Sequence, residues 1–196
     1  MVITPVILQG TRVRMEPLSL EKHFEGLLAI GLDPELWRWT LNACATREDL
    51  SAYLREALNM QSEGSAIPFG TVEQATGRVL GCTRFGNIEP KHRRVEIGWT
   101  WVGRAFQRTH VNTEAKHLML RHAFETWGCV RVELKTNALN KKSRAAILRI
   151  GAKEEGTLRK HAISDTGVVR DTVYFSITDD EWPGVKARLE AMLNGG

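Results

Sequence analysis

The chain has 196 residues, a hydrophobic share of 42% and a net charge of +4, which suit one α/β domain with a substantial core. No apolar run is long enough to span a bilayer, and the first residues lack the pattern of a signal peptide. The three cysteines form no CxxC pair, which argues against a disulfide framework or a zinc site and favours a reducing compartment. We therefore expect a cytoplasmic protein that holds no metal and binds no membrane.

The hydrophobic spacing of the first half predicts a strand, three helices and a hairpin. The strand covers 6–16, the helices cover 19–30, 33–39 and 46–62, and the hairpin joins strands 67–73 and 79–85. In the first strand, Val13 and Met15 would face one side while Arg12 and Arg14 face the other.

The second half alternates strands and helices before it ends in a hairpin and a helix. The predicted elements are a strand at 94–102, a helix at 113–127, a strand at 130–136, a helix at 140–150, strands at 157–163 and 171–177, and a helix at 179–193. The helix at 113–127 is apolar nearly all round, so we expect it to be sandwiched. The central β-α-β order implies one parallel pair in an otherwise antiparallel sheet, where two strands can splay and admit a ligand.

The stretch from Val95 to Asn112 is the most informative, because it predicts a strand, a short polar turn and the start of a long helix. The first N–H groups of a helix lack partners inside the helix, and its start carries partial positive charge. A phosphate group is stabilised at such a position. The segment therefore predicts a nucleotide or coenzyme site.

Five features in this order resemble the GNAT superfamily of acyl-CoA N-acyltransferases, and more closely its RimJ/RimL-like branch. They are the strand EIGWTWV, the turn Gln107–Asn112 in place of Q/R-x-x-G-x-G/A, Thr113-Glu114-Ala115, Asn140–Ser143 as N-x-x-S, and Gly151-Ala152. The resemblance covers about residues 8–178. It implies an α/β fold, of the α+β type, across one domain (1–196): a mixed, mostly antiparallel sheet with a central splayed parallel pair, flanked by helices.

The resemblance implies that acetyl-CoA lies against the turn, the strand before it and the start of the short helix. The cofactor-binding residues would be Trp101, Val102, Gln107, Arg108, Thr109, His110, Val111, Asn112, Thr113, Asn140 and Ser143. A backbone N–H near Trp101 or Val102 would stabilise the carbonyl oxygen as it gains charge. His110 and Asn112 stand where the family has small residues, so either the backbone N–H groups suffice or coenzyme binding is lost.

The short helix supplies a candidate catalytic acid. The resemblance implies that Ser143 could protonate the leaving thiolate. Many family members use a tyrosine where this chain has Ile147, so that role is vacant, has moved to Ser143, or the thiolate leaves unaided. Asn140 would contact the pantetheine arm, or it would serve only as a helix N-cap. The basic residues near the site favour an anionic ligand, although each one alone could be ordinary surface charge. These residues are Arg104, Arg108, Lys141, Lys142 and Arg144.

An amine must lose its proton before it attacks a thioester. The resemblance implies Glu96 as the general base, because it lies on the strand before the turn, at the spacing from Gln107 where some GNAT acetyltransferases keep a catalytic glutamate. Strand alternation would give two faces, with Glu96, Gly98 and Thr100 on one and Val95, Ile97, Trp99 and Trp101 on the other. The alternative is that Glu96 forms only an ion pair with Arg84 or Arg94.

The predicted function is transfer of an acetyl group from acetyl-CoA to a primary amine, with Trp37 and Trp39 lining the acceptor groove. The acceptor would be a protein N-terminus or a small amine, and the protein could act as a homodimer. A catalytically inactive module that binds or senses coenzyme A is the alternative, favoured by His110, Asn112 and Ile147. Nucleic-acid binding is the third possibility, and it is weaker because the basic groups are short and lack interleaved aromatics.

Overall fold

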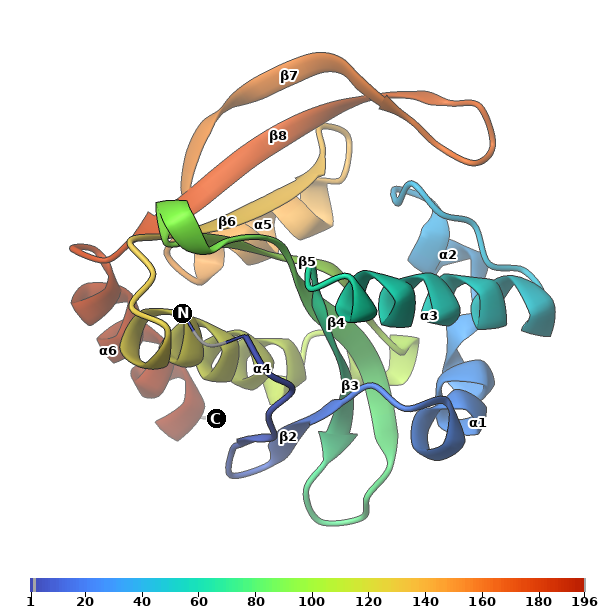
Figure 1. Cartoon of the computed structure of the whole chain (residues 1–196), viewed down its shortest axis with the longest axis horizontal. Helices are drawn as coiled ribbons and strands as arrows, with labels where there is room; N and C mark the ends of the chain where they lie inside the picture. Colours follow the sequence, from blue (N-terminus) through green and yellow to red (C-terminus); the bar gives the residue numbers. More distant parts are fainter. Residues whose placement is uncertain (2, 196) are drawn as a thin grey trace.

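A computed structural model describes Met1 and residues 3–195, and its centre is an eight-stranded sheet with the order β1-β2-β3-β4-β5-β6-β8-β7 (Figure 1). Neighbouring strands are antiparallel except β5 and β6, which run parallel. The strands are β1 (Leu8–Gln9), β2 (Val13–Pro17), β3 (Ile67–Glu73), β4 (Val79–Glu89), β5 (Arg94–Val102), β6 (Arg131–Asn137), β7 (Lys153–Ile163) and β8 (Val169–Thr178). The predicted fold class is confirmed.

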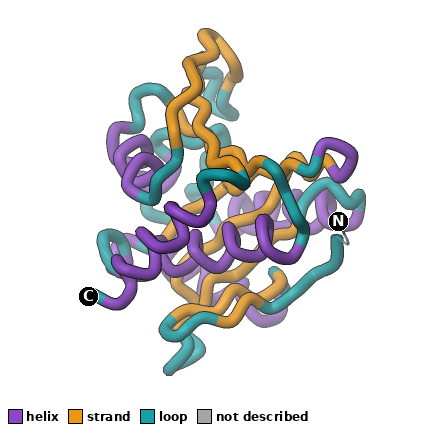
Figure 2. The backbone as a smooth tube through the Cα atoms, turned by 90° about the vertical axis from the view of Figure 1, so that its left-hand side faces the viewer, coloured by secondary structure: helices purple, strands orange, loops and turns teal. Residues whose placement is uncertain are grey.

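Helices cover both faces of the sheet. Helices α4 and α6 pack together on one face (Figure 2), while α1 packs on β4 and α3 packs on β3 on the other. The helices are α1 (Leu20–Gly31), α2 (Pro34–Trp37), α3 (Arg47–Ser62), α4 (His110–Arg121), α5 (Lys141–Arg149) and α6 (Trp182–Asn194), with short turns at Pro90–His92, Arg104–Phe106 and His122–Thr126. Nearly every side chain of α4 is buried, so the predicted sandwiching of this helix is confirmed.

Local capping explains where the helices begin. Ser19, Asp33 and Thr46 each accept a backbone N–H from the first turn of α1, α2 and α3. Thr46 and Asp49 form a reciprocal capping box, which satisfies two N–H groups that the helix itself leaves without partners. Each cap can be recognised from one or two residues of the sequence. The three helices therefore start where the sequence predicts.

Several predicted boundaries were wrong: β4 extends to Glu89, β7 begins at Lys153, and α6 begins at Trp182. Two further differences have a clear physical cause. The first strand is broken into β1 and β2, because the Glu114 carboxylate accepts the N–H groups of Thr11 and Arg12 and holds a turn there. Helix α4 begins at His110, three residues before the predicted start, because Thr109 acts as its N-cap. Val13 and Met15 on β2 are fully buried, as the alternation predicts.

A β-bulge in β5 changes which residues share a face. Arg84 pairs with Gly98 and Cys82 pairs with Trp101, so two β5 residues lie opposite a single residue of β4. Trp99 in the bulge has a φ of 50°, in the left-handed region. The side chains beyond the bulge are therefore reversed relative to simple alternation.

The predicted face for Thr100 and Trp101 was wrong for this reason. Thr100 accepts a hydrogen bond from Lys116 Nζ of α4 at 2.7 Å, on the face opposite to Glu96. Trp101 packs in the apolar cluster beneath α1–α3 and lies 5.7 Å from the ring of Trp37, whereas Ile97 lies in the cluster under α4. The bulge therefore turns one half of β5 over relative to the other.

The parallel strands separate soon after they begin. Strands β5 and β6 pair only over Arg94–Glu96 and Arg131–Glu133, although each strand continues for several residues. Their carboxyl ends lead to the starts of α4 and α5. The predicted splayed pair is therefore present, and the region beyond Glu96 and Glu133, where the two strands no longer pair and lead to α4 and α5, is called the opening below.

Candidate active site

The start of α4 offers backbone donors to a ligand. The Thr109 hydroxyl caps the helix by accepting the Val111 N–H, and it donates to the Phe106 carbonyl at 2.7 Å. The N–H groups of His110 and Asn112 precede the first donor of the helical ladder, so neither has an intrahelical partner. These two groups and the helix dipole form a position suited to an anion.

Backbone conformation explains how the turn tolerates residues larger than glycine. His110 and Asn112 lie inside α4 in the right-handed region, which any residue adopts. Left-handed backbone occurs instead at Arg108, where φ is 61°. His110 is half-buried, and its Nε2 is buried without a hydrogen-bond partner among the residues that the structure describes. The departure from the small-residue pattern therefore leaves the two free N–H groups in place.

Several of the predicted coenzyme residues have side chains that are engaged elsewhere. Gln107 Nε2 donates to the carbonyl of Val102 at 3.1 Å, which fixes the turn to the end of β5. Trp101 and Val111 are core residues, and Thr113 is buried and accepts a hydrogen bond from Arg149 at 2.7 Å. A ligand at this opening would meet the backbone of these residues rather than their side chains.

Helix α5 begins on the other side of the opening. Asn140 caps it by accepting the Ser143 N–H at 3.0 Å, so the capping role considered from the sequence is present. The Ser143 hydroxyl is half-buried and makes no hydrogen bond within the described part of the chain. Ile147 is buried in the core, so Ser143 is the hydroxyl that α5 offers near its start.

The charges around the opening are partly neutralised. Arg144 forms an ion pair with Glu154, and Arg104 lies 3.7 Å from Asp33. Lys141 and Lys142 are exposed at the start of α5 and form no ion pair in the described residues. These two lysines therefore carry free positive charge in the first turn of this helix.

Glu96 lies at the vertex where β5 and β6 separate. Its side chain is only 2% exposed, and Oε2 lies 2.9 Å from Lys135 Nζ and 2.6 Å from Asn87 Nδ2. Oε1 lies over Gly98, where an added Cβ would approach it to 2.7 Å. The glycine therefore leaves room beside a carboxylate oxygen that accepts no hydrogen bond from the described residues.

Glu96 does form an ion pair, but its partner is Lys135 rather than Arg84 or Arg94, the partners that the sequence suggested. Arg84 instead lies between the rings of Tyr53 and Trp99, and Arg94 pairs with Glu133 and Glu89. Lys135 takes the position beside Glu96 because β6 is the parallel neighbour of β5 at this point.

A sequence profile of the acetyltransferase (GNAT) domain matches residues 12–153, which is most of the chain. The chain belongs to the GNAT acetyltransferase family. It is 34% identical over 110 residues to the putative ribosomal N-acetyltransferase YdaF of Bacillus subtilis (strain 168). The aligned region covers 56% of this chain and 59% of that protein. This relative supports the RimJ/RimL-like branch within the GNAT family.

Solved structures agree with the GNAT fold. A putative acetyltransferase from T. thermophilus is 37% identical with a TM-score of 0.89, covering 98% of this chain and all of that one. Mycobacterium smegmatis RimJ, solved in complex with CoA-disulfide, is 24% identical with a TM-score of 0.75, covering 95% of this chain and 91% of that one. At that identity, the second likeness concerns the fold alone.

The two tryptophans predicted at the acceptor side of this GNAT domain differ in position. Trp37 is buried in the cluster under α1–α3, and its Nε1 donates to the Gly31 carbonyl at 2.7 Å. Trp39 follows α2, is half-buried and lies under the Arg38 guanidinium. Trp39 is therefore partly exposed and could contact an acceptor, whereas Trp37 is a core residue.

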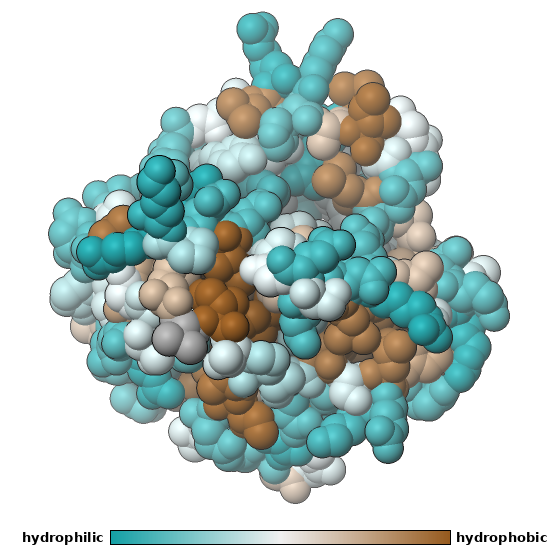
Figure 3. All heavy atoms as spheres, viewed as in Figure 1, coloured by the Kyte–Doolittle hydropathy of each residue, from teal (hydrophilic) through white to brown (hydrophobic). Residues whose placement is uncertain are grey.

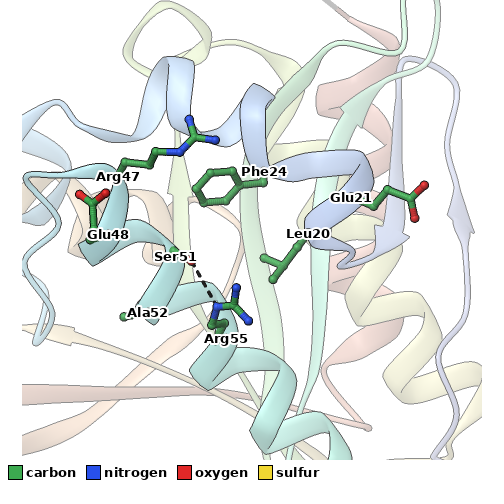
Figure 4. Close-up of a pocket in the computed structure, with 8 residues that line it drawn as sticks. All are labelled: Leu20, Glu21, Phe24, Arg47, Glu48, Ser51, Ala52 and Arg55. Atoms are coloured by element: carbon green, nitrogen blue, oxygen red, sulfur yellow. Dashed lines mark hydrogen bonds between the residues drawn. The ribbon is translucent and has the colours of Figure 1, made fainter.

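A pocket of about 660 Å³ lies between α1 and α3 (Figure 4), and no predicted site residue lines it. Arg47 in this pocket stacks on the Phe24 ring and forms an ion pair with Glu25. Among the described residues, no helix is long and apolar enough to cross a membrane, and no cluster of His, Cys, Asp or Glu is placed to hold a metal ion.

Sequence reasoning missed several polar residues around Glu96. Lys135, Asn87 and Arg170 come from three different strands, and none belongs to a recognisable motif. The available signal was the alternation of Lys135 with apolar neighbours on β6, which predicts that it shares a sheet face with Glu96 only once the strand pairing is known.

Proposed function

We propose that this protein transfers the acetyl group of acetyl-CoA to a primary amine. The observation that carries the proposal is the opening between β5 and β6 beyond Glu96, with the starts of α4 and α5 at its edge. The free N–H groups of His110 and Asn112 suit the pyrophosphate of the coenzyme. Lys141 and Lys142 add positive charge for its other phosphate oxygens.

The chain's own groups suffice for the chemistry of transfer. The amine attacks the thioester carbon, the C–S bond breaks, and the coenzyme leaves as a thiolate. Glu96 accepts the proton of the amine at Oε1, directly or through a water molecule. Ser143 donates a hydrogen bond to the thiolate and passes it a proton while it takes one from water, so that the hydroxyl is restored. A backbone N–H near Trp101 or Val102 stabilises the carbonyl oxygen while it carries charge.

A peptide or protein N-terminus is the acceptor that two observations favour. The relative from Bacillus subtilis is named as a putative ribosomal N-acetyltransferase. In addition, the β7–β8 hairpin exposes several apolar side chains, and the upper part of Figure 3 shows separate hydrophobic patches among hydrophilic atoms. These side chains are Leu158, Ile163, Val168 and Val169. Exposed apolar groups of this kind commonly mark contact with another chain.

Calorimetric titration with acetyl-CoA tests the first half of the proposal. Micromolar binding is expected, because the free N–H groups and the two lysines match the charge of the coenzyme. Thiol release is then followed with a panel of peptides, amino acids and small amines. Binding without release from any amine would favour the coenzyme-sensing module, which the missing hydroxyl at Ile147 supports.

Glu96→Gln tests the proposed base. The variant keeps the hydrogen bond from Asn87 but cannot accept the proton, so kcat should fall about 10²- to 10⁴-fold with little change in coenzyme affinity. Glu89→Gln is the matched control, because Glu89 is half-exposed at the end of β4. Equal kcat for Glu96→Gln and the unmodified protein would exclude Glu96 as the base.

A further inference from the structure

One polar face of the sheet lies around Glu96, opposite the face that α4 covers. Glu96 is in register with Glu133, and alternation along β6 places Lys135 and Asn137 on the same face. Their partners on β8 are Tyr174 and Thr172, and Arg170 follows at the same spacing of two. Side chains from three strands therefore meet on one surface beside the predicted base.

Positive charge exceeds negative charge on this face. Lys135 pairs with Glu96, whereas the buried Arg170 forms no ion pair in the described residues. Arg170 Nε donates to Thr172 Oγ1 at 3.1 Å, and its two terminal nitrogens make no hydrogen bond in the described part of the chain. A buried cation without an anion is costly, so an anionic group would be stabilised beside Arg170.

Arg84 is a third cation on the same face, and its side chain is fully buried. Its guanidinium carbon lies 5.1 Å from the Tyr53 ring and 4.8 Å from the Trp99 ring. The aromatic faces stabilise this cation without neutralising it. Lys135 Nζ, which pairs with Glu96, also lies 5.7 Å from the centre of the Trp99 ring. Within the described residues, Lys135 pairs with Glu96, and Arg94 and Arg131 pair with Glu133. Arg84 and Arg170 are therefore the cations of this face that no described carboxylate neutralises.

The tip of the β7–β8 hairpin contacts the segment between α2 and α3. The hairpin extends from the sheet toward the segment between α2 and α3 (Figure 1), and the Asp165 N–H donates to the Leu41 carbonyl at 2.8 Å. Asn42 adds a contact to the Asp165 carboxylate at 3.4 Å. Arg170 pairs with Ala162 of β7, so along the hairpin it lies between this bridge and Tyr174, which pairs with Lys135.

We infer that this face binds a carboxylate carried by one of the two substrates, with Arg170 as the principal partner. The inference rests on the proposed transfer reaction and specifies the substrate class. The carboxylate belongs either to the amine acceptor, as in an acidic N-terminal peptide, or to the far end of a dicarboxylic acyl group on the coenzyme. Polyamines and other purely cationic amines are poor acceptors, because they would add positive charge to a face that already has an excess.

The experiment compares matched pairs of substrates that differ in one carboxylate. In the acceptor arm, acetyl-CoA is tested with the peptide Ser-Glu-Ala-amide, with Ser-Gln-Ala-amide and with spermidine. In the donor arm, succinyl-CoA is compared with butyryl-CoA, which has the same number of acyl carbons, using the neutral peptide. Transfer is measured as kcat/KM, and binding to the protein is measured separately by calorimetry, with coenzyme A present for the peptides.

A preference of about 10- to 100-fold for the carboxylate is expected in one arm, because an ionic hydrogen bond of this kind contributes that much to affinity. Arg170→Gln should abolish the preference, so that the kcat/KM values for the two members of each matched pair become equal. Arg170→Lys keeps the charge and should retain most of the preference. Arg159→Gln, on the exposed outer strand of the same hairpin, is the control that should change nothing.

The outcomes separate this inference from the proposed function. Transfer without a carboxylate preference in either arm, a preference that survives in a folded Arg170→Gln variant, or faster transfer to spermidine would overturn the inference and leave the transferase proposal standing. Carboxylate-dependent binding without any transfer would support the inference and refute the transferase proposal. If Arg170→Gln fails to fold, Arg170→Lys and the substrate pairs still decide, since a matched amide that binds equally well refutes carboxylate recognition.

Discussion

Lys116 is a buried ammonium group in α4 whose replacement should stabilise the protein. It is 5% exposed and donates to Thr100 Oγ1 at 2.7 Å, but it forms no ion pair in the described residues. Burial therefore lowers the pKa of Lys116 from 10.5 to about 7. Lys116→Met removes the ammonium and keeps a side chain of similar length and apolar character.

The size of the effect follows from the linkage between pKa and stability. A fall of the pKa from 10.5 to about 7 corresponds to a cost of about 5 kcal/mol, at about 1.36 kcal/mol per pKa unit. Because the native pKa is the lower one, this cost is fully present below pH 7 and disappears as the pH rises from about 7 to 10.5. Losing the hydrogen bond to Thr100 offsets about 1 kcal/mol, so a net gain of about 3–4 kcal/mol is expected at acidic to neutral pH.

Urea unfolding at several pH values measures this directly. At about pH 6.5 the Lys116→Met variant should be more stable than the unmodified protein, and the difference should fall to about 1 kcal/mol or less near pH 10. Lys22→Met, an exposed position on α1, should show no such dependence. A stability difference between the Lys116 variant and the unmodified protein that does not change with pH would refute the reasoning, as would destabilisation at pH 6.5.

Two further predictions concern the turn before α4 and an ion pair on the sheet. Arg108 has a φ of 61°, so Arg108→Gly should be about 1 kcal/mol more stable than Arg108→Ala in thermal unfolding, and equal stability would contradict the strain. The hydrogen bond from Arg131, with a second from Ser176, lowers the pKa of Glu155 from 4.5 to about 2. The stability from this pair is present above pH 4.5 and lost as the pH falls toward 2, so the thermal midpoints of the unmodified protein and Glu155→Gln should converge in acid. A midpoint difference that stays constant down to pH 2 would show that the Glu155 carboxylate is not the cause.

Local chemistry fixed the parts of this protein that could be predicted. The caps at Ser19 and Thr46 and the spacing of apolar residues along each segment act over a few residues, so the helix and strand order was readable. The parallel pair followed from the β-α-β order alone. The likeness of the turn Gln107–Asn112 and of Asn140–Ser143 to one family then gave a predicted anion site, and these segments lie at the carboxyl ends of β5 and β6.

Strand register and contacts between distant segments decided the rest. The bulge at Trp99 depends on how β4 pairs with β5, and it reversed the predicted faces of Thr100 and Trp101. The turn between β1 and β2 is held by Glu114, about a hundred residues away in the chain. The partners of Glu96 come from strands that become its neighbours only when the sheet forms, because side-chain alternation gives faces within one strand but does not say which faces meet.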